Sequence, residues 1–195
     1  RYKIVSDEGM QELTKPPEER SHEQMLAMAQ QIKSSTLFSS LPAEVQSTEA
    51  VAGLLSDAQL LQADSLGFTF ANQGDEIDGL FMVLAGSVSE YRFAVATLEW
   101  EDTNQPLGAG QYFGSLSLDH KHNTYADCFR SGPKGAVVAK VLKTAMEREM
   151  EAQHETVIRE RAQFLKTTYL FSTWPFKRLM QVAALMLPRA YGPQE

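Results

Sequence analysis

The chain has 195 residues, of which 43% are hydrophobic, 9% aromatic and 22% charged, with a formal net charge of -7. Its length and apolar share can bury a globular core, which excludes a disordered or collagen-like chain. The negative charge repels phosphate backbones and excludes a broad nucleic-acid-binding surface. The single cysteine, Cys128, excludes a disulfide framework and a cysteine-rich zinc module. No apolar run approaches the roughly 20 residues of a membrane span, so we expect a cytoplasmic protein.

Helices are predicted at the start of the chain. Segment 1–35 is predicted to be helical over residues 16–33, where apolar residues recur at helical spacing after a Pro-Pro-Glu-Glu start. A second helix is predicted over residues 44–61, because Val51 and Leu55 lie on one apolar stripe. These short helices are expected to pack as a small cap.

Short β-strands are predicted between residues 66 and 142. The hydrophobic period there changes to two, and turn residues such as Gly74 and Gly86 separate the apolar runs. The polar stretch 97–105 is predicted to be a loop, and residues 125–129 and 136–142 are further strand candidates. Many short strands joined at glycines are typical of a sandwich or barrel.

The pattern becomes helical again over residues 143–166, where Met146, Met150 and Ile158 recur at four- and eight-residue steps. Glu155 and Arg159 form an oriented i,i+4 pair on this predicted connecting helix.

A sequence repeat follows that helix. The segment Thr36–Pro42 reappears as Tyr169–Pro175, with four of seven residues identical and an offset of 133 residues. Each copy is followed by an apolar helical patch, and the offset matches the length of a whole domain. We therefore expect residues 167–195 to be the truncated start of a second domain like the one at 36–142.

The segment Gln73–Val88 resembles the cyclic nucleotide-binding domain family, which has a Gln-Gly-Asp turn, an Asp, an apolar strand and a Gly-x-Val turn at this place. Gly108–Gly114 is similar to that family's entry into its phosphate-binding cassette. The resemblance covers residues 36–165. It implies a mainly β fold, an eight-stranded jelly roll (double-stranded β-helix) with N- and C-terminal helices. Tandem copies resemble the regulatory subunits of cyclic-AMP-dependent kinase.

The same resemblance places a ligand cassette after Gly114. In the family, this segment opens a short helix whose N–H groups face the cyclic phosphate, a Glu accepts the ribose 2′-hydroxyl and an Arg pairs with the phosphate. Here Ser115 stands in place of the Glu, and Thr124 or Asn123 in place of the Arg. The cassette residues implied for this chain are Gly114, Ser115, Leu116, Ser117, Thr124, Tyr125 and Ala126, with Lys121 and Arg130 as candidate substitute cations.

These replacements predict weak or lost binding of cyclic AMP and cyclic GMP. An arginine–phosphate fork is bidentate and charge-assisted, and a neutral hydroxyl does not reproduce it. Its loss from a buried site costs about 2–5 kcal/mol, or roughly 30- to several-thousand-fold in affinity. We therefore expect a non-catalytic regulatory or sensor module, with a nucleoside-like purine as an alternative ligand, no cofactor and no enzyme activity.

Two other interpretations remain open. One is a ligand-free module on the same fold that binds a protein partner through the helices at 16–33 and 143–165. The other is a cupin-like metal enzyme, because His120 and His122 alternate like strand ligands and Asp127 follows them. The metal interpretation is the weaker, since the only later histidine, His154, falls in the predicted helix.

Overall fold

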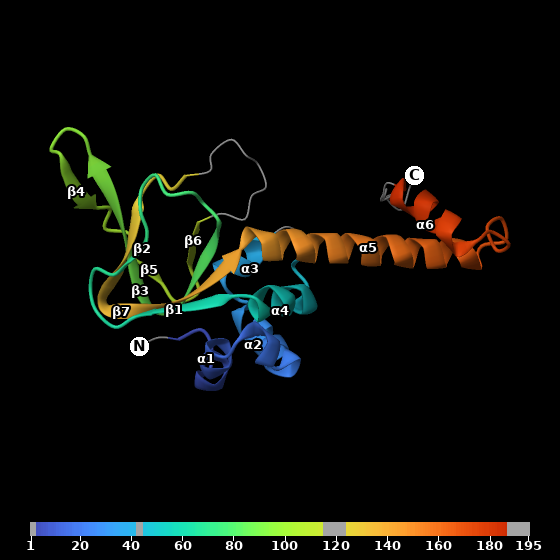
Figure 1. The fold of residues 1–195 in the computed structure, drawn as a ribbon, viewed down its shortest axis with the longest axis horizontal. Helices are drawn as coiled ribbons and strands as arrows, with labels where there is room; N and C mark the ends of the chain where they lie inside the picture. Colours follow the sequence, from blue (N-terminus) through green and yellow to red (C-terminus); the bar gives the residue numbers. More distant parts are fainter. Residues whose placement is uncertain (1–2, 42–44, 115–123, 187–195) are drawn as a thin grey trace, which may run out of the picture. The chain divides into compact units, whose positions relative to one another are not determined.

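The computed structural model describes residues 3–41, 45–114 and 124–186 of the chain. It divides into two compact units, Arg1–Glu149 and Met150–Glu195, with the boundary inside helix α5 (Lys143–Thr167). We describe each unit by itself (Figure 1).

The first unit is built around one antiparallel sheet with the strand order β1-β7-β3-β4. Strand β2 pairs with β7, and strands β5 and β6 both pair with β3. The strands are β1 (Gln59–Ala63), β2 (Thr69–Ala71), β3 (Gly79–Ala94), β4 (Glu99–Asp102), β5 (Leu107–Gly108), β6 (Tyr112–Gly114) and β7 (Cys128–Leu142).

Strands β3 and β7 bend together, and this bend turns the sheet into a roll. Gly86 has φ +80°, and a Cβ there would lie 2.2 Å from the carbonyl oxygen of Gly135. Gly135 has φ +71°, and a Cβ there would lie 2.1 Å from the carbonyl oxygen of Ala63. The register between β3 and β7 shifts on both sides of this point, as at a β-bulge. Only glycine tolerates such a positive φ together with so close a backbone contact.

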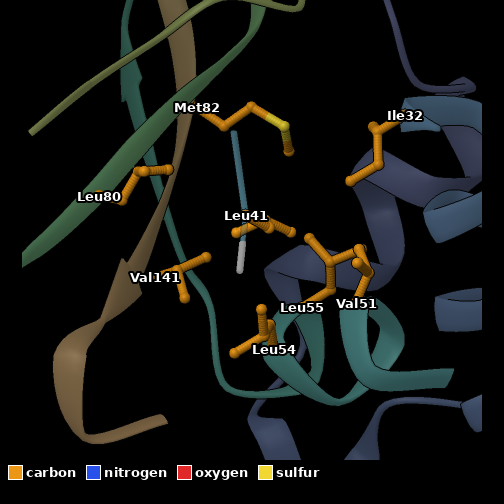
Figure 2. A pocket seen from close by; sticks show the side chains of 8 residues that line it. All are labelled: Ile32, Leu41, Val51, Leu54, Leu55, Leu80, Met82 and Val141. Carbon is orange, nitrogen blue, oxygen red and sulfur yellow. The ribbon is translucent and has the colours of Figure 1, made fainter. Parts of the chain in front are cut away.

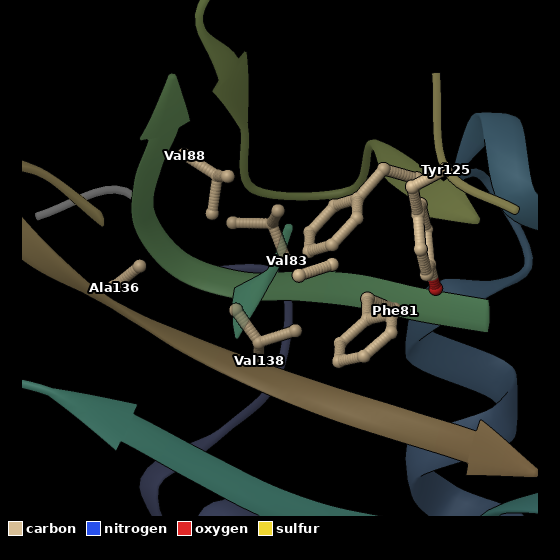
Figure 3. Close-up of a cluster of buried hydrophobic side chains, with 8 residues drawn as sticks. Phe81, Val83, Val88, Tyr125, Ala136 and Val138 are labelled. Atoms are coloured by element: carbon tan, nitrogen blue, oxygen red, sulfur yellow. The ribbon is translucent and has the colours of Figure 1, made fainter. Parts of the chain in front are cut away.

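Alternation along β3 separates the two faces of the sheet. Phe81 and Val83 point into the roll, where Figure 3 shows them meeting Val138 and Tyr125. The buried cluster inside the roll comprises Ala71, Phe81, Val83, Val88, Phe113, Tyr125, Ala136 and Val138.

Leu80 and Met82 lie on the other face, against the helical cap. They surround, with residues of helices α2 and α4 and of β7, an apolar void of about 10 Å³ (Figure 2). A void of this size and lining stays dry and is too small for a ligand. Its lining residues are Ile32, Leu41, Val51, Leu54, Leu55, Leu80, Met82 and Val141.

The helical cap has two short α-helices more than the sequence pattern predicts. Its elements are α1 (Asp7–Thr14), the 3₁₀ turn η1 (Pro17–Glu19), α2 (His22–Ile32), α3 (Thr36–Ser40) and α4 (Thr48–Ser56). Ser6 caps α1 by accepting the Gly9 N–H at 3.1 Å. Helix α1 spans 8 residues, and its large apolar residues are Met10 and Leu13, too short a run to predict a helix, although Leu13 is buried.

Arg20 ties this cap together. Its Nη1 donates to the carbonyl oxygens of Leu55, Ser56 and Ala58 at 2.7–3.1 Å, where α4 ends. Its Nη2 donates to Leu13 at 3.0 Å, where α1 ends. The last carbonyls of a helix have no partner within the helix, so one half-buried guanidinium supplies donors for two helix ends.

The helix predicted over 44–61 is therefore too long. It stops at Ser56, where Arg20 takes up the carbonyls, and residues 59–63 form strand β1 instead. In β1, Leu61 packs against the core of the roll.

The strand predictions are correct in kind and wrong in several boundaries. The predicted loop 97–105 contains strand β4, whose four residues are all exposed and so show no hydrophobic alternation. The candidates 125–129 and 136–142 prove to be parts of one long strand. That strand begins at Cys128, so residues 125–127 lie outside it. The described residues form seven strands rather than eight, because β3 passes through Gly86 without a break.

The second unit contains the later part of α5 and helix α6 (Phe176–Ala184). Leu179 and Ala183 of α6 pack on Ala162 and Leu165 of α5. The predicted helix over 143–166 is confirmed within two residues by α5. No helix in the part of the chain that the structure describes is both long enough and apolar enough to cross a membrane.

Replacing Arg20 with alanine tests the cap. We expect Arg20→Ala to lower the free energy of unfolding by about 3 kcal/mol, because several helix-end carbonyls lose a charged donor. That change corresponds to a melting temperature lower by about 6–12 °C, measured by circular dichroism. Lys33→Ala, which removes an exposed cation at the end of α2, is the matched control. Equal melting temperatures for the two variants would contradict this role of Arg20.

Candidate ligand-binding site

The cassette region begins where strand β6 ends, at Gly114. This glycine has φ +86°, and a Cβ on it would lie 2.6 Å from the Gly79 carbonyl oxygen and 3.0 Å from the Tyr125 hydroxyl. The close approach lets β6 pair with β3 as far as the register Leu80 to Gly114. Glycine is therefore required at this position for steric reasons.

The Gln-Gly-Asp turn anchors the other end of the cassette region. Gly74 N–H donates to the Tyr125 carbonyl at 2.8 Å, and Tyr125 N–H donates to the Asp75 carbonyl at 2.9 Å. Glu76 and Thr124 form an isolated antiparallel bridge beside them. Backbone hydrogen bonds thus fix the position of residues 124 and 125 against this turn.

The side chains of residues 124–126 alternate between solvent and core. Thr124 and Ala126 are exposed, whereas Tyr125 is buried. The Tyr125 hydroxyl lies 3.5 Å from the Gly79 carbonyl oxygen, at the limit of a hydrogen bond. Burial raises the pKa of Tyr125 well above its usual value, and the carboxylates of Asp78 and Asp75 raise it further. Tyr125 is therefore neutral and acts as part of the core.

The other residues predicted for the cassette divide into two groups. Ser115, Leu116, Ser117 and Lys121 lie outside the described residues. Arg130 is described, and its guanidinium lies over the rings of Tyr91 and Trp100. The neighbouring residue Phe129 packs into the roll, so alternation along β7 places Arg130 on the opposite face.

The interior of the roll beside the cassette is lined by stacked rings. Phe113 stacks on Phe81 with ring centroids 4.7 Å apart, and on Phe129 at 4.4 Å. Tyr125 meets the edges of Phe81 and Phe129 at 6.3 and 6.0 Å. Phe81 and Phe113 are 2% and 4% exposed, so these rings fill the core of the roll next to the cassette region.

A Lys–Asp pair at this end of the roll was not predicted from the sequence. Lys140 on β7 pairs in register with Phe81, and its ammonium lies 5.2 Å from the centre of that ring. The ammonium also binds the Asp78 carboxylate at 2.6 Å. The sequence signal for this pair is Lys140 itself, a lone lysine within the apolar run 136–142. Strand alternation puts it on the same face as the buried Val138, where its ammonium needs a carboxylate partner.

A second polar cluster lies on the inner face of the β3–β4 hairpin. Arg92 forms a fork with the buried Asp127, with N–O distances of 2.7 and 3.0 Å. Glu90 lies beside this fork, and the Thr103 hydroxyl donates to the Glu90 carboxylate at 3.5 Å. With Glu101 and other polar residues of the hairpin, Glu90 and Arg92 line an open cleft of about 370 Å³.

The two carboxyl groups of this cluster have opposite pKa shifts. Burial and the neighbouring Asp127 carboxylate raise the pKa of Glu90. The hydrogen bonds from Arg92 lower the pKa of Asp127. A proton shared between the two groups is therefore held on Glu90, while Asp127 stays ionised in its pair with Arg92.

Two of the residues considered for a metal site fall outside the described part of the chain. His120 and His122 lie outside the described residues, and Asp127 is engaged by Arg92. No group of three or more potential metal ligands occurs among the residues that the structure describes.

Three solved structures have the same architecture as this chain. The sensor domain of the transcriptional regulator DNR from Pseudomonas aeruginosa is 16% identical, with a TM-score of 0.53 over 73% of this chain and 92% of that domain. The regulatory domain of Toxoplasma gondii protein kinase A with cyclic AMP is 16% identical, with a TM-score of 0.51 over 85% of this chain and 59% of that one. The chain has the cyclic nucleotide-binding fold.

A third structure with this fold is an altered regulatory subunit of a cyclic-AMP-independent protein kinase A from Trypanosoma brucei. It carries Glu→Ala, Thr→Arg and Val→Ala substitutions and is bound to cyclic AMP in its A site. It is 17% identical, with a TM-score of 0.50 over 83% of this chain and 52% of that one. No protein-family model and no curated protein sequence matches this chain. Likeness at this identity establishes the fold, and function has to be argued from the site.

The Glu90–Asp127 pair predicts a pH-dependent stability. Because its folded-state pKa is raised, Glu90 favours the fold while protonated and disfavours it once pH rises through that pKa. We expect Glu90→Gln to raise the melting temperature at pH 7 by about 1–3 °C, a gain that vanishes below pH 4.5, the ordinary Glu value. Asp127→Asn should do the opposite at pH 7, because Arg92 loses its partner. A Glu90→Gln variant that is less stable than the parent at pH 7 would contradict the assignment.

Proposed function

We propose that this chain is a non-catalytic regulatory or sensor module in which the binding of cyclic AMP and cyclic GMP is weak or lost. The observation that carries the proposal is Thr124. It occupies the place that the family resemblance gives to the phosphate-binding arginine, and it presents an exposed hydroxyl instead of a guanidinium. A hydroxyl makes neither the fork nor the charge interaction with a phosphate.

The electrostatics around Thr124 support the same conclusion. The adjoining turn carries Asp75, Glu76 and Asp78. The ammonium of Lys140 is committed to Asp78. A cyclic phosphate placed here would meet these carboxylates, which is unfavourable at low dielectric.

The comparison with the Trypanosoma brucei protein agrees with this argument. That regulatory subunit belongs to a cyclic-AMP-independent kinase, and the altered form bound to cyclic AMP carries an arginine introduced in place of a threonine. We propose by analogy that an arginine at position 124 is what this chain lacks.

A nucleoside-like ligand fits the described surroundings better than a cyclic phosphate. A neutral purine carries no charge, so it is not repelled by the carboxylates of Asp75 and Asp78. The alternative is a ligand-free module that binds a protein partner through its flanking helices.

The route from the roll to a partner would run through α5. This helix continues directly from β7, and its first turns contact α4, where Arg148 pairs with Asp57. A Cβ added at Gly53 of α4 would lie 2.5 Å from a carboxylate oxygen of Glu149. A change in the roll that moved the end of β7 would therefore act on both helices, which we propose as partner surfaces together with residues 16–33.

Calorimetry on the full chain tests the proposal. We expect no saturable micromolar heat with cyclic AMP or cyclic GMP. The double variant Ser115→Glu and Thr124→Arg should bind cyclic AMP at least about 30-fold more tightly, because it regains the sugar acceptor and the phosphate fork. Ser115→Gln with Thr124→Gln is the control of similar size without the charges. Micromolar binding of cyclic AMP by the parent chain would contradict the proposal.

Adenosine in the same experiment separates the two versions of the proposal. Saturable heat with adenosine, in the absence of heat with cyclic AMP, supports a sensor of a nucleoside-like ligand. Flat titrations with all three compounds favour the ligand-free interaction module.

We also propose that residues 167–195 begin a second domain. Leu41 and Leu54 of the first unit are 6% and 3% exposed under the sheet, whereas the matching Trp174 and Leu185 of the repeat are 38% and 85% exposed. The proposal rests on the sequence repeat and on this difference in exposure.

Fluorescence of an apolar dye such as ANS tests the second-domain proposal. The exposed face of the repeat should bind the dye, and Leu170→Asp with Leu185→Asp should lower the signal at unchanged helix content. Equal dye fluorescence in parent and variant would mean that this face is covered within the chain and needs no second sheet.

A further inference from the structure

The side chain of Arg130 is held in a defined position outside the cassette. It lies on β7 and is half-buried, with its guanidinium carbon 5.1 Å from the ring centre of Tyr91 and 5.5 Å from that of Trp100. Tyr91 belongs to β3 and Trp100 to β4, which pair with each other. Phe93 supports the Trp100 ring from the side, with centroids 5.4 Å apart. The guanidinium is therefore oriented by two neighbouring strands and is not a free surface cation.

The hydrogen-bonding capacity of Arg130 is not used by the rest of the described chain. Its Nε is buried and has no hydrogen-bond partner among the described residues, and no ion pair of Arg130 occurs within them. Aromatic rings stabilise the face of a guanidinium but accept none of the bonds that its five N–H groups donate in the plane. A buried donor without an acceptor costs free energy, so this atom requires an explanation.

Three carboxylates near Arg130 have other partners or lie on the other face of the sheet. Asp127, one residue before β7, pairs with Arg92 on the opposite face of the sheet. Glu90 lies on that opposite face too, since it pairs in register with Phe129. The Asp102 carboxylate accepts the backbone N–H of Asn104 at 2.8 Å. The contrast between Arg92, which has its fork, and Arg130, which has none, indicates that the acceptor for Arg130 comes from a ligand.

We propose that Arg130, framed by Tyr91 and Trp100, is an oxyanion-binding site separate from the cassette, which takes a carboxylate or a phosphate group of a ligand. A guanidinium binds either group through two parallel N–H bonds, and its orientation here is set before the ligand arrives. Trp100 is 42% exposed, so its ring also offers an apolar surface to the part of the ligand next to the anion. This site does not depend on the function proposed for the cassette.

Fluorescence of Trp100 tests this site directly. The chain has two tryptophans, so Trp174→Phe leaves Trp100 as the single reporter. Sodium phosphate and sodium acetate are titrated separately, with sodium chloride keeping the ionic strength constant. We expect a saturable change with at least one of the two oxyanions. A response to phosphate alone assigns a phosphate-bearing ligand, and a response to acetate assigns a carboxylate.

Variants then connect the response to Arg130. Arg130→Gln should abolish it, and Arg130→Lys should weaken it at least tenfold, because an ammonium forms no fork. Lys134→Gln, which removes an exposed cation on the same strand, should leave it unchanged. If Arg130→Gln does not fold, the Nε–Hε nuclear magnetic resonance signal of Arg130 in the unaltered chain reports the same binding. No response beyond chloride, or an equal response in Arg130→Gln, would overturn the proposal.

Discussion

The antiparallel pairing of β3 with β7 through a shared bend is the constraint on which the first unit depends. Both strands cross the bend at glycines whose Cβ positions are occupied by carbonyl oxygens, Gly86 on β3 and Gly135 on β7. These two strands carry Phe81 and Phe129 of the interior ring cluster, and β3 continues into the hairpin with β4. The β7 strand then continues into α5. A substitution at either glycine would therefore disturb the core, the cassette end and the start of the helix together.

Three cations of this unit are each engaged by groups of the chain in a different way. Arg20 serves two helix ends, Lys140 neutralises Asp78 beside the cassette, and Arg92 holds Asp127 at the hairpin. Each is satisfied by groups of the chain itself, so none is available to a phosphate in the cassette without breaking an existing bond. Arg130 differs from all three, because its partner is missing from the described residues. Arg20, Lys140 and Arg92 are thus paired within the chain, while Thr124, at the position proposed for a phosphate-binding arginine, is neutral.

Much of the fold could be predicted from the sequence, because periodicity and glycine placement are local signals. Helix α5 and the strand at Leu80–Val83 were both predicted from such signals and are present in the structure. The end of α4 could not be predicted, since it depends on Arg20, which is more than thirty residues away in the sequence. Strand β4 was missed because all its side chains are exposed, and pairing with β3 alone makes it a strand.

The site was less predictable than the fold. The positions of Gly114 and Thr124 follow from motif spacing, and the structure brings Thr124 and Tyr125 against the Gln-Gly-Asp turn. The pairings of Lys140 with Asp78 and of Arg130 with two aromatic rings join residues far apart in the sequence. Such contacts depend on strand register, which a single sequence does not specify.

Amide hydrogen exchange at Gly74 and Tyr125 is the most direct test of the central claim, that the roll persists without its anion clamp. These two N–H groups close the bonds between the turn and the cassette end. We predict slow exchange at both in the free chain, with rates unchanged by millimolar cyclic AMP. Fast exchange in the free chain would show that the cassette end is not formed, and marked slowing by cyclic AMP would show that the site still binds the cyclic phosphate.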